Sequence, residues 1–138
     1  PNDYLNLISP IINKKIDVVY GSRVLGKKRY IDDNFISFFR TFGNHVLTII
    51  SNFINKQNLT DAHTCYKVFR TEIFKNLDLQ ENGFSFCPEV TTKLSNKKIQ
   101  IMEIPINYNG RTVQEGKKIR FIDAFFAVKT IIKYKYFK

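Results

Sequence analysis

Apolar side chains recur at intervals of three and four residues in several stretches of the chain, a spacing that predicts amphipathic helices. The longest stretch is rich in phenylalanine and isoleucine and presents a broad apolar face. Residues suited to capping helix ends stand near the boundaries of these stretches. We expect helices at about residues 3–13, 34–54, 88–96 and 121–136, with a shorter one beginning at residue 71.

Shorter runs between these helices have the character of β-strands. Residues 16–20 form a largely β-branched run that Gly21 stops, and residues 64–69 and 99–108 are strand-like. Pro105 demotes the last of these towards the edge of a sheet or a bulge. Because strands and helices alternate along the chain, the sequence predicts an α/β fold. Such open sheets bind ligands at the carboxyl ends of their strands, where Gly21-Ser22-Arg23 is expected.

Composition narrows the class of protein. The chain has 138 residues, which fits one domain, and its 13 Phe and 7 Tyr supply apolar surface for a core. Its 22 Lys and Arg against 12 Asp and Glu give a net charge of +10, which points to a nucleic acid, a phosphorylated substrate or an anionic lipid surface as partner. The chain starts at Pro1 and its single methionine is Met102, so we expect a fragment.

Several kinds of site are disfavoured. Cys65 and Cys87 lie far apart and form no CxxC pair, which argues against a disulfide scaffold or a zinc site. His63 and Cys65 alone are too few for a metal site. The sequence has no Walker-type or GxGxxG loop and suggests no nucleophile–histidine–acid set.

Arginine side chains are the first candidate ligands for an anion. Arg23 directly follows a buried strand, where either a bound anion or an ion pair within the fold accounts for it. Arg40 and Asn44 stand one helical turn apart, so they share a face and are able to bind an anion together. An ion pair of Arg40 with Asp32 or Asp33 is the alternative.

The remaining candidates have ordinary structural interpretations beside the functional ones. Arg111 and Lys117 belong to a basic loop around Gly116, which either closes over a phosphate or is simply solvated. Asp61 is by default a turn or cap residue. Glu89 stands in a first helical turn, where a carboxylate complements the helix dipole without any catalytic duty.

Several of these segments stand in an order that carries a family resemblance. They are Pro1-Asn2-Asp3-Tyr4, Asp17-Val18-Val19-Tyr20-Gly21-Ser22-Arg23, Arg40 with Gly43-Asn44, Leu59-Thr60-Asp61, Thr64-Cys65-Tyr66-Lys67-Val68-Phe69-Arg70, Phe86-Cys87-Pro88-Glu89, Ile104-Pro105-Ile106-Asn107-Tyr108 leading to Arg111, and Glu115-Gly116-Lys117-Lys118-Ile119. Together they resemble the C-terminal part of a family 2 glycosyltransferase of the dolichol-phosphate mannosyltransferase-like branch. Their order and spacing are more specific than any single motif.

The resemblance implies a GT-A fold, a Rossmann-like sheet whose N-terminal half binds the nucleotide sugar. In that family an Asp-x-Asp motif holds a Mg or Mn ion against the donor diphosphate, and it would precede Pro1. Residues 1–138 would then be the acceptor-side part of a single glycosyltransferase domain whose N-terminal, nucleotide-sugar-binding part is missing. Such a fragment would hold no metal ligands and would be inactive alone.

The same resemblance assigns roles to individual residues. The acceptor phosphate would be bound by Arg23, Arg40 and Asn44, and the donor diphosphate by Arg111 and Lys117. The catalytic candidates are Asp61, which would face the sugar or organise the acceptor loop, and Glu89, at the place of a catalytic-base carboxylate.

The implied reaction is transfer, with inversion, from a nucleotide sugar of the GDP-mannose or UDP-glucose type to a polyprenyl or dolichyl phosphate. The phenylalanine-rich helix and the last helix would contact a membrane peripherally, at its cytoplasmic inner face, or else pack in the core. The alternatives are a family 2 enzyme with a cell-surface polysaccharide acceptor, a non-catalytic scaffold, or a basic nucleic-acid-binding module. We expect no nucleic-acid partner, because no reading motif is recognisable.

Overall fold

A computed structural model describes residues 3–13, 15–25, 35–107 and 121–137; the side chains of residues 35–41 and 121 are outside that description. The described helices and strands alternate along much of the chain, which confirms the predicted α/β class. In order they are α1 (Tyr4–Ile12), β1 (Val18–Ser22), α2 (Phe35–Asn55), β2 (Lys67–Phe69), α3 (Thr71–Lys75), the 3₁₀ turn η1 (Gly83–Ser85), α4 (Phe86–Asn96), β3 (Met102–Pro105) and α5 (Phe121–Tyr136).

The strands form a small mixed sheet in the order β2-β1-β3. β1 is central, with β2 antiparallel to it and β3 parallel to it. All five residues of β1 are buried, as expected of a central strand covered on both faces. β3 ends at Pro105 on the sheet edge, in agreement with the position that the sequence predicts for this proline.

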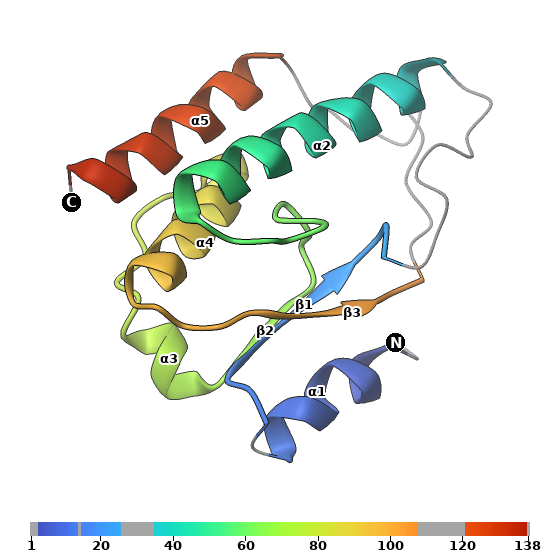
Figure 1. The fold of residues 1–138 in the computed structure, drawn as a ribbon, viewed down its shortest axis with the longest axis vertical. Coiled ribbons are helices and arrows are strands. Elements are labelled where there is room, and N and C mark those ends of the chain that lie inside the picture. The colour runs from blue at the N-terminus through green and yellow to red at the C-terminus, as the bar shows by residue number, and fades with distance from the viewer. Residues whose placement is uncertain (1–2, 14, 26–34, 108–120, 138) are drawn as a thin grey trace.

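Helices cover both faces of the sheet, and β1 divides the core between them. On one face, Leu7 of α1 packs with Val19 and Ile106. On the other face, Val18 and Tyr20 pack with residues that include Val90 and Leu94 of α4, and α2 and α5 lie over that side. Figure 1 shows α1 below the sheet and α2, α4 and α5 above it. β1 therefore lies between α1 on one face and α2, α4 and α5 on the other.

The strand boundaries differ from the predicted ones where side chains bind the backbone. The predicted strand at 64–69 begins only at Lys67, because Thr64 Oγ1 donates to the Gly21 carbonyl and accepts from the Tyr66 amide, which holds a turn there. β1 covers 18–22 rather than 16–20, so Ser22 is still part of the sheet. β3 is shorter than the predicted 99–108. The described helices lie within a residue or two of the predicted ranges.

Gly21 is a point of close approach between three chain segments. A Cβ at this position would lie 2.7 Å from Ile106 Cγ2 and 2.9 Å from Tyr66 Cβ, both tighter than normal contacts. The Gly21 amide also donates to the Tyr66 carbonyl at 2.7 Å, so neither neighbour is easily displaced. The segment leading to Arg23 therefore depends on the absence of a side chain here.

We expect Gly21→Ala to lower the free energy of unfolding by about 1–3 kcal/mol through overpacking, measured by urea unfolding. Gly43→Ala is the matched control, because nothing lies within 4 Å of a Cβ added there and the position is helical. Alanine at Gly43 should raise stability by about 0.5–1 kcal/mol. Equal effects at the two glycines would contradict the close-approach account.

Among the described residues, none of the helices combines the length and apolarity needed to cross a bilayer. The long apolar stretch forms α2. The buried side of this helix includes two polar residues, Thr48 and Ser51. Its exposed side includes Ile49 and Phe53.

Candidate functional site

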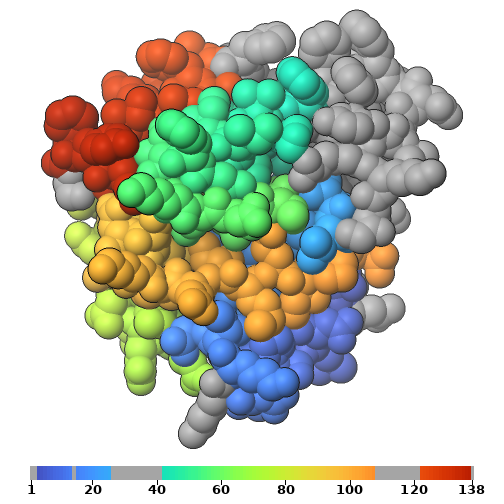
Figure 2. Space-filling view, viewed as in Figure 1, coloured from blue at the N-terminus to red at the C-terminus, as the bar shows by residue number. Residues whose placement is uncertain are grey.

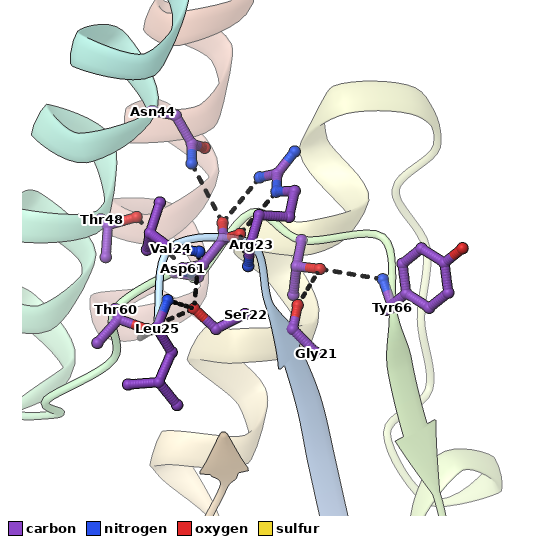
Figure 3. A network of polar contacts seen from close by, with 12 residues as sticks. Gly21, Ser22, Arg23, Val24, Leu25, Asn44, Thr48, Thr60, Asp61 and Tyr66 are labelled. Carbon is purple, nitrogen blue, oxygen red and sulfur yellow. Dashed lines mark hydrogen bonds and ion pairs between the residues drawn. The ribbon is translucent and has the colours of Figure 1, made fainter. Parts of the chain in front are cut away.

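The carboxyl end of β1 meets two other segments at a polar cluster. Ser22 ends the strand, Arg23 follows it, and the loop at residues 59–64 and Asn44 of α2 lie against them (Figure 3). Ser22 Oγ pairs with Thr60 Oγ1 at 2.7 Å and accepts from the Leu25 amide at 3.0 Å. The serine therefore turns the chain sharply after the strand and fixes it to the loop.

Arg23 and Asp61 form a two-pronged ion pair at the centre of this cluster. Arg23 Nε donates to Asp61 Oδ2 at 2.6 Å, and Nη2 donates to Oδ1 at 2.8 Å. The Arg23 amide adds a third hydrogen bond to Oδ2 at 3.2 Å, and Asn44 Nδ2 donates to Oδ1 at 3.1 Å. Asp61 is fully buried whereas 24% of the Arg23 side chain is exposed. Arg23 therefore lies between the buried carboxylate of Asp61 and the solvent.

These contacts fix Asp61 in its charged form. Burial by itself disfavours a carboxylate, but the hydrogen bonds and charge of Arg23 and the amide of Asn44 outweigh it, so the pKa of Asp61 lies below its ordinary value. Since four donors already occupy its oxygens, the carboxylate is a weak proton acceptor. Its geometry suits it to orient Arg23 and Asn44 rather than to take up a proton.

Two further charged residues hold the backbone of the 59–64 loop. The Glu103 carboxylate accepts from the Thr60 amide at 2.7 Å and from the Asp61 amide at 2.9 Å. From the other side, the Lys67 ammonium donates to the carbonyls of Ala62 and Thr64. Both were missed as site residues at the sequence level. The signal for Glu103 is a lone carboxylate between apolar residues in the short strand Met-Glu-Ile-Pro.

Of the residues predicted to bind the acceptor phosphate, the structure brings Arg23 and Asn44 together at Asp61. Arg40 lies in α2 one turn before Asn44, and its side chain is outside the described residues. Arg111 and Lys117, predicted to bind the donor diphosphate, also lie outside the described residues. Their roles remain predictions.

Glu89 belongs to a separate set of contacts in the first turn of α4. Its fully buried carboxylate accepts from the Gln80 amide at 2.9 Å and the Glu81 amide at 2.8 Å, and it pairs with Lys93 at 2.8 Å. Burial opposes its charge, but the hydrogen bonds from Lys93 and the two amides prevail, so the pKa of Glu89 lies below its ordinary value. The carboxylate ties the 80–81 segment to α4, and its catalytic role stays a prediction.

His63, in the same loop as Asp61, makes the stability of the fold depend on pH. Burial, reinforced by the positive charge of Lys67, lowers its pKa from 6.5 to about 4. Between these values the unfolded chain binds a proton that the folded chain refuses, so stability is complete above pH 6.5 and falls as the pH drops towards 4. Asp61, with a lowered pKa, loses its contribution only at still lower pH.

We therefore expect the free energy of unfolding to decline between pH 6.5 and 4, with a slope of at most ~1.4 kcal/mol per pH unit from this group. His63→Gln should flatten that part of the curve, measured by urea unfolding at several pH values. An unchanged slope in the variant would show that His63 is not the responsible group.

Within the described residues, no three His, Cys, Asp or Glu side chains come together as a set able to hold a metal ion. The ion pair with Asp61 holds the guanidinium of Arg23, which is partly exposed and is chemically able to bind an anion. The chemistry that the cluster offers is therefore positioning and electrostatic stabilisation of an anion.

Comparison with known proteins gives two similar sequences. A low-salt glycan biosynthesis hexosyltransferase of Haloferax volcanii is 26% identical over 105 residues, which are 76% of this chain and 25% of that protein. A UDP-N-acetylglucosamine–dolichyl-phosphate N-acetylglucosaminyltransferase of Methanococcus voltae is 27% identical over 108 residues, which are 77% of this chain and 42% of that protein. No protein-family model and no solved structure matches the chain.

The chain thus spans less than half the length of either relative. Both similarities are weak, and both support a glycosyltransferase family. The mixed α/β architecture with its small sheet is consistent with a fragment of a glycosyltransferase domain.

Proposed function

We propose that the protein containing this chain transfers a sugar from a nucleotide sugar to a polyprenyl phosphate, and that this chain is the acceptor-side part of the enzyme. The observation that carries the proposal is the cluster of Arg23, Asn44 and Asp61 at the carboxyl end of β1. A guanidinium that is fixed by two hydrogen bonds to a carboxylate and is still partly exposed to solvent is suited to bind a phosphate. Support comes from the glycosyltransferase names of both relatives, one of which includes dolichyl phosphate.

In this proposal the acceptor phosphate oxygen attacks the anomeric carbon in line, the bond to the nucleoside diphosphate breaks, and the sugar configuration inverts. A phosphate is already anionic at neutral pH, so the enzyme needs to place it rather than deprotonate it. Arg23 would meet its oxygens, Arg40 and Asn44 would complete the contact from α2, and Asp61 would keep the guanidinium aligned. Asp61 is then a positioning residue.

The donor side is assigned by resemblance. Arg111 and Lys117 would close over the donor diphosphate. A Mg or Mn ion, which would neutralise charge on that diphosphate, would be held by the N-terminal Asp-x-Asp motif that the resemblance implies. We further assign the enzyme to the dolichol-phosphate mannosyltransferase-like branch of family 2, with a donor of the GDP-mannose or UDP-glucose type.

We also propose that α2 and α5 contact a membrane peripherally, at its cytoplasmic face. The two helices pack side by side in the outer layer of the fold (Figure 1). Large apolar side chains are exposed on both, including Phe53 at 86% and Phe125 at 64%. Lys129, which is exposed one helical turn after Phe125, would meet anionic head groups.

Replacing Phe53 and Phe125 together by serine should weaken binding to phosphatidylglycerol vesicles by about tenfold to a hundredfold, because each ring would lose its burial in the lipid interface. Vesicle flotation measures the bound fraction. Phe74→Ser on α3, also exposed, is the control and should bind normally. Equal losses in both variants would contradict a membrane face at α2 and α5.

The acceptor assignment is tested by titrating the ¹⁵N-labelled protein, in detergent micelles, with dolichyl monophosphate and separately with dolichol, and by following the amide shifts. Saturable binding is expected, with none for dolichol, which lacks the phosphate. Arg23→Lys should weaken the binding because a lysine cannot replace the fork. Equal binding of dolichol and its phosphate would rule out Arg23 as the acceptor-phosphate ligand.

A further inference from the structure

An open cavity of about 940 Å³ lies away from the Arg23–Asp61 pair. It opens between the C-terminal ends of α2, α4 and α5 and the segment that leads into β3. Ile16, before β1, and Met102, at the start of β3, place it near the amino ends of these strands, whereas Arg23 follows the carboxyl end of β1. Figure 2 shows the end of α2 and the following residues, in green, lying against the orange segment around residue 100.

The lining of this cavity is positively charged. Lys56, Lys98 and Lys135 line it, and the described lining contains neither Asp nor Glu. Lys135 is held in place, since its ammonium donates to Ser95 Oγ at 3.1 Å and that hydroxyl donates to the Asn55 carbonyl at 2.7 Å. Three ammonium groups around one cavity without a carboxylate favour an anionic ligand.

Two residues of this lining carry a buried acceptor oxygen that has no donor within the described part of the chain. Asn55 is 3% exposed, and its Nδ2 donates to Ser51 Oγ and Thr92 Oγ1 while its Oδ1 has no partner among the described residues. Gln57 Oε1 is also buried and has no hydrogen-bond donor among the described residues. An unpaired buried carbonyl is destabilising, so a turn of either amide side chain towards a ligand that brings O–H or N–H donors would be favourable.

We infer that this cavity is a second ligand site and that it binds a sugar phosphate. Phosphate oxygens would accept from the lysine ammonium groups and, once the amide side chains turn towards the cavity, sugar hydroxyls would donate to Asn55 Oδ1 and Gln57 Oε1. Apolar lining residues such as Leu59 and Ile101 offer a surface for the C–H face of the ring. The inference stands on these residues alone and is independent of the proposed transferase activity.

The test is a titration of the ¹⁵N-labelled protein with glucose 6-phosphate, glucose and inorganic phosphate, followed by amide shifts. Saturable shifts with glucose 6-phosphate are expected at residues 56–59 and 96–101, with weaker binding of the other two probes. Shifts confined to residues 22–25 and 59–61 would place the ligand at the Arg23 site instead and would overturn the inference.

Variants with matched charge sharpen this test. Lys56→Gln combined with Lys98→Gln should raise the Kd for glucose 6-phosphate by about tenfold or more, because each lysine supplies a charge-assisted hydrogen bond. Lys75→Gln combined with Lys97→Gln removes the same charge outside the lining and should leave the Kd within about twofold. Equal effects of the two pairs would mean non-specific attraction by net charge and would refute the site.

The sugar part of the inference has its own variant. Gln57→Met keeps the length of the side chain but removes the acceptor, so it should weaken glucose 6-phosphate and leave inorganic phosphate unaffected. Inorganic phosphate binding as tightly as glucose 6-phosphate, with no effect of Gln57→Met, would show an anion site without sugar recognition and would overturn the assignment.

Discussion

Arg23→Gln is expected to lower the free energy of unfolding by about 3–5 kcal/mol, because it leaves the fully buried carboxylate of Asp61 without its cation. Asp61→Asn should cost less. That change leaves behind the charge of Arg23, whose side chain is 24% exposed and can be hydrated. The two partners of one ion pair are therefore expected to differ in how much their removal destabilises the fold, as measured by urea unfolding at neutral pH.

The double variant completes this prediction. With Arg23→Gln and Asp61→Asn together, no buried charge is left unpaired, so the double variant should be more stable than Arg23→Gln alone. Additive losses in the double variant would mean that the pair is not energetically coupled and that the bidentate contact does not govern this end of β1.

In the proposed transferase, Arg23→Lys is expected to lower kcat/KM for a polyprenyl phosphate by about 10²–10³-fold, the size of effect seen when one preorganised donor to a developing charge is removed. Lysine keeps the positive charge, so the Asp61 carboxylate remains paired and the fold should be retained. The loss would come from the two-pronged contact with Asp61, which fixes the direction of the guanidinium and which lysine lacks.

Arg70→Lys is the matched control for this prediction. Arg70 also forms an ion pair, with Asp17, but at the beginning of β1 rather than after its end. Transfer should therefore be nearly unchanged in Arg70→Lys. If both arginine variants lost activity equally, the effect would reflect general destabilisation and not the acceptor site.

Local patterns were sufficient for the helices and for the position of Arg23. Helix spacing is a property of neighbouring residues, so the ranges of α1, α2, α4 and α5 follow from the sequence to within a residue or two. The β-branched run before Gly21 likewise predicts a buried strand, and Arg23 is found at its carboxyl end. The same pattern identified a candidate anion ligand but could not name its partner.

The sequence did not reveal the partners of Arg23, because they come from segments far away along the chain. Asp61 lies 38 residues after Arg23 and sits in a stretch that by itself predicts only a turn. Glu103, which holds the amides of Thr60 and Asp61, lies more than 40 residues further on. Only the pairing of β1 with β3 places these groups together, and no periodicity in the sequence encodes that pairing.

Glu89 illustrates the opposite case, in which a correct local argument was incomplete. A carboxylate in the first turn of α4 does agree with the helix dipole. The carboxylate also accepts hydrogen bonds from the amides of Gln80 and Glu81, which precede the helix and the 3₁₀ turn. The segment that contains Gln80 and Glu81 has no sequence motif that predicts this contact with Glu89.

The most direct test of the central claim is transfer by the complete protein that contains this chain. Membranes carrying it would be supplied with radiolabelled GDP-mannose, UDP-glucose or UDP-N-acetylglucosamine, a Mg or Mn salt, and dolichyl monophosphate. The account predicts a labelled lipid that requires the phosphate on the acceptor and that disappears with Arg23→Lys but persists with Arg70→Lys. Label appearing equally with dolichol, or with both arginine variants, would contradict it.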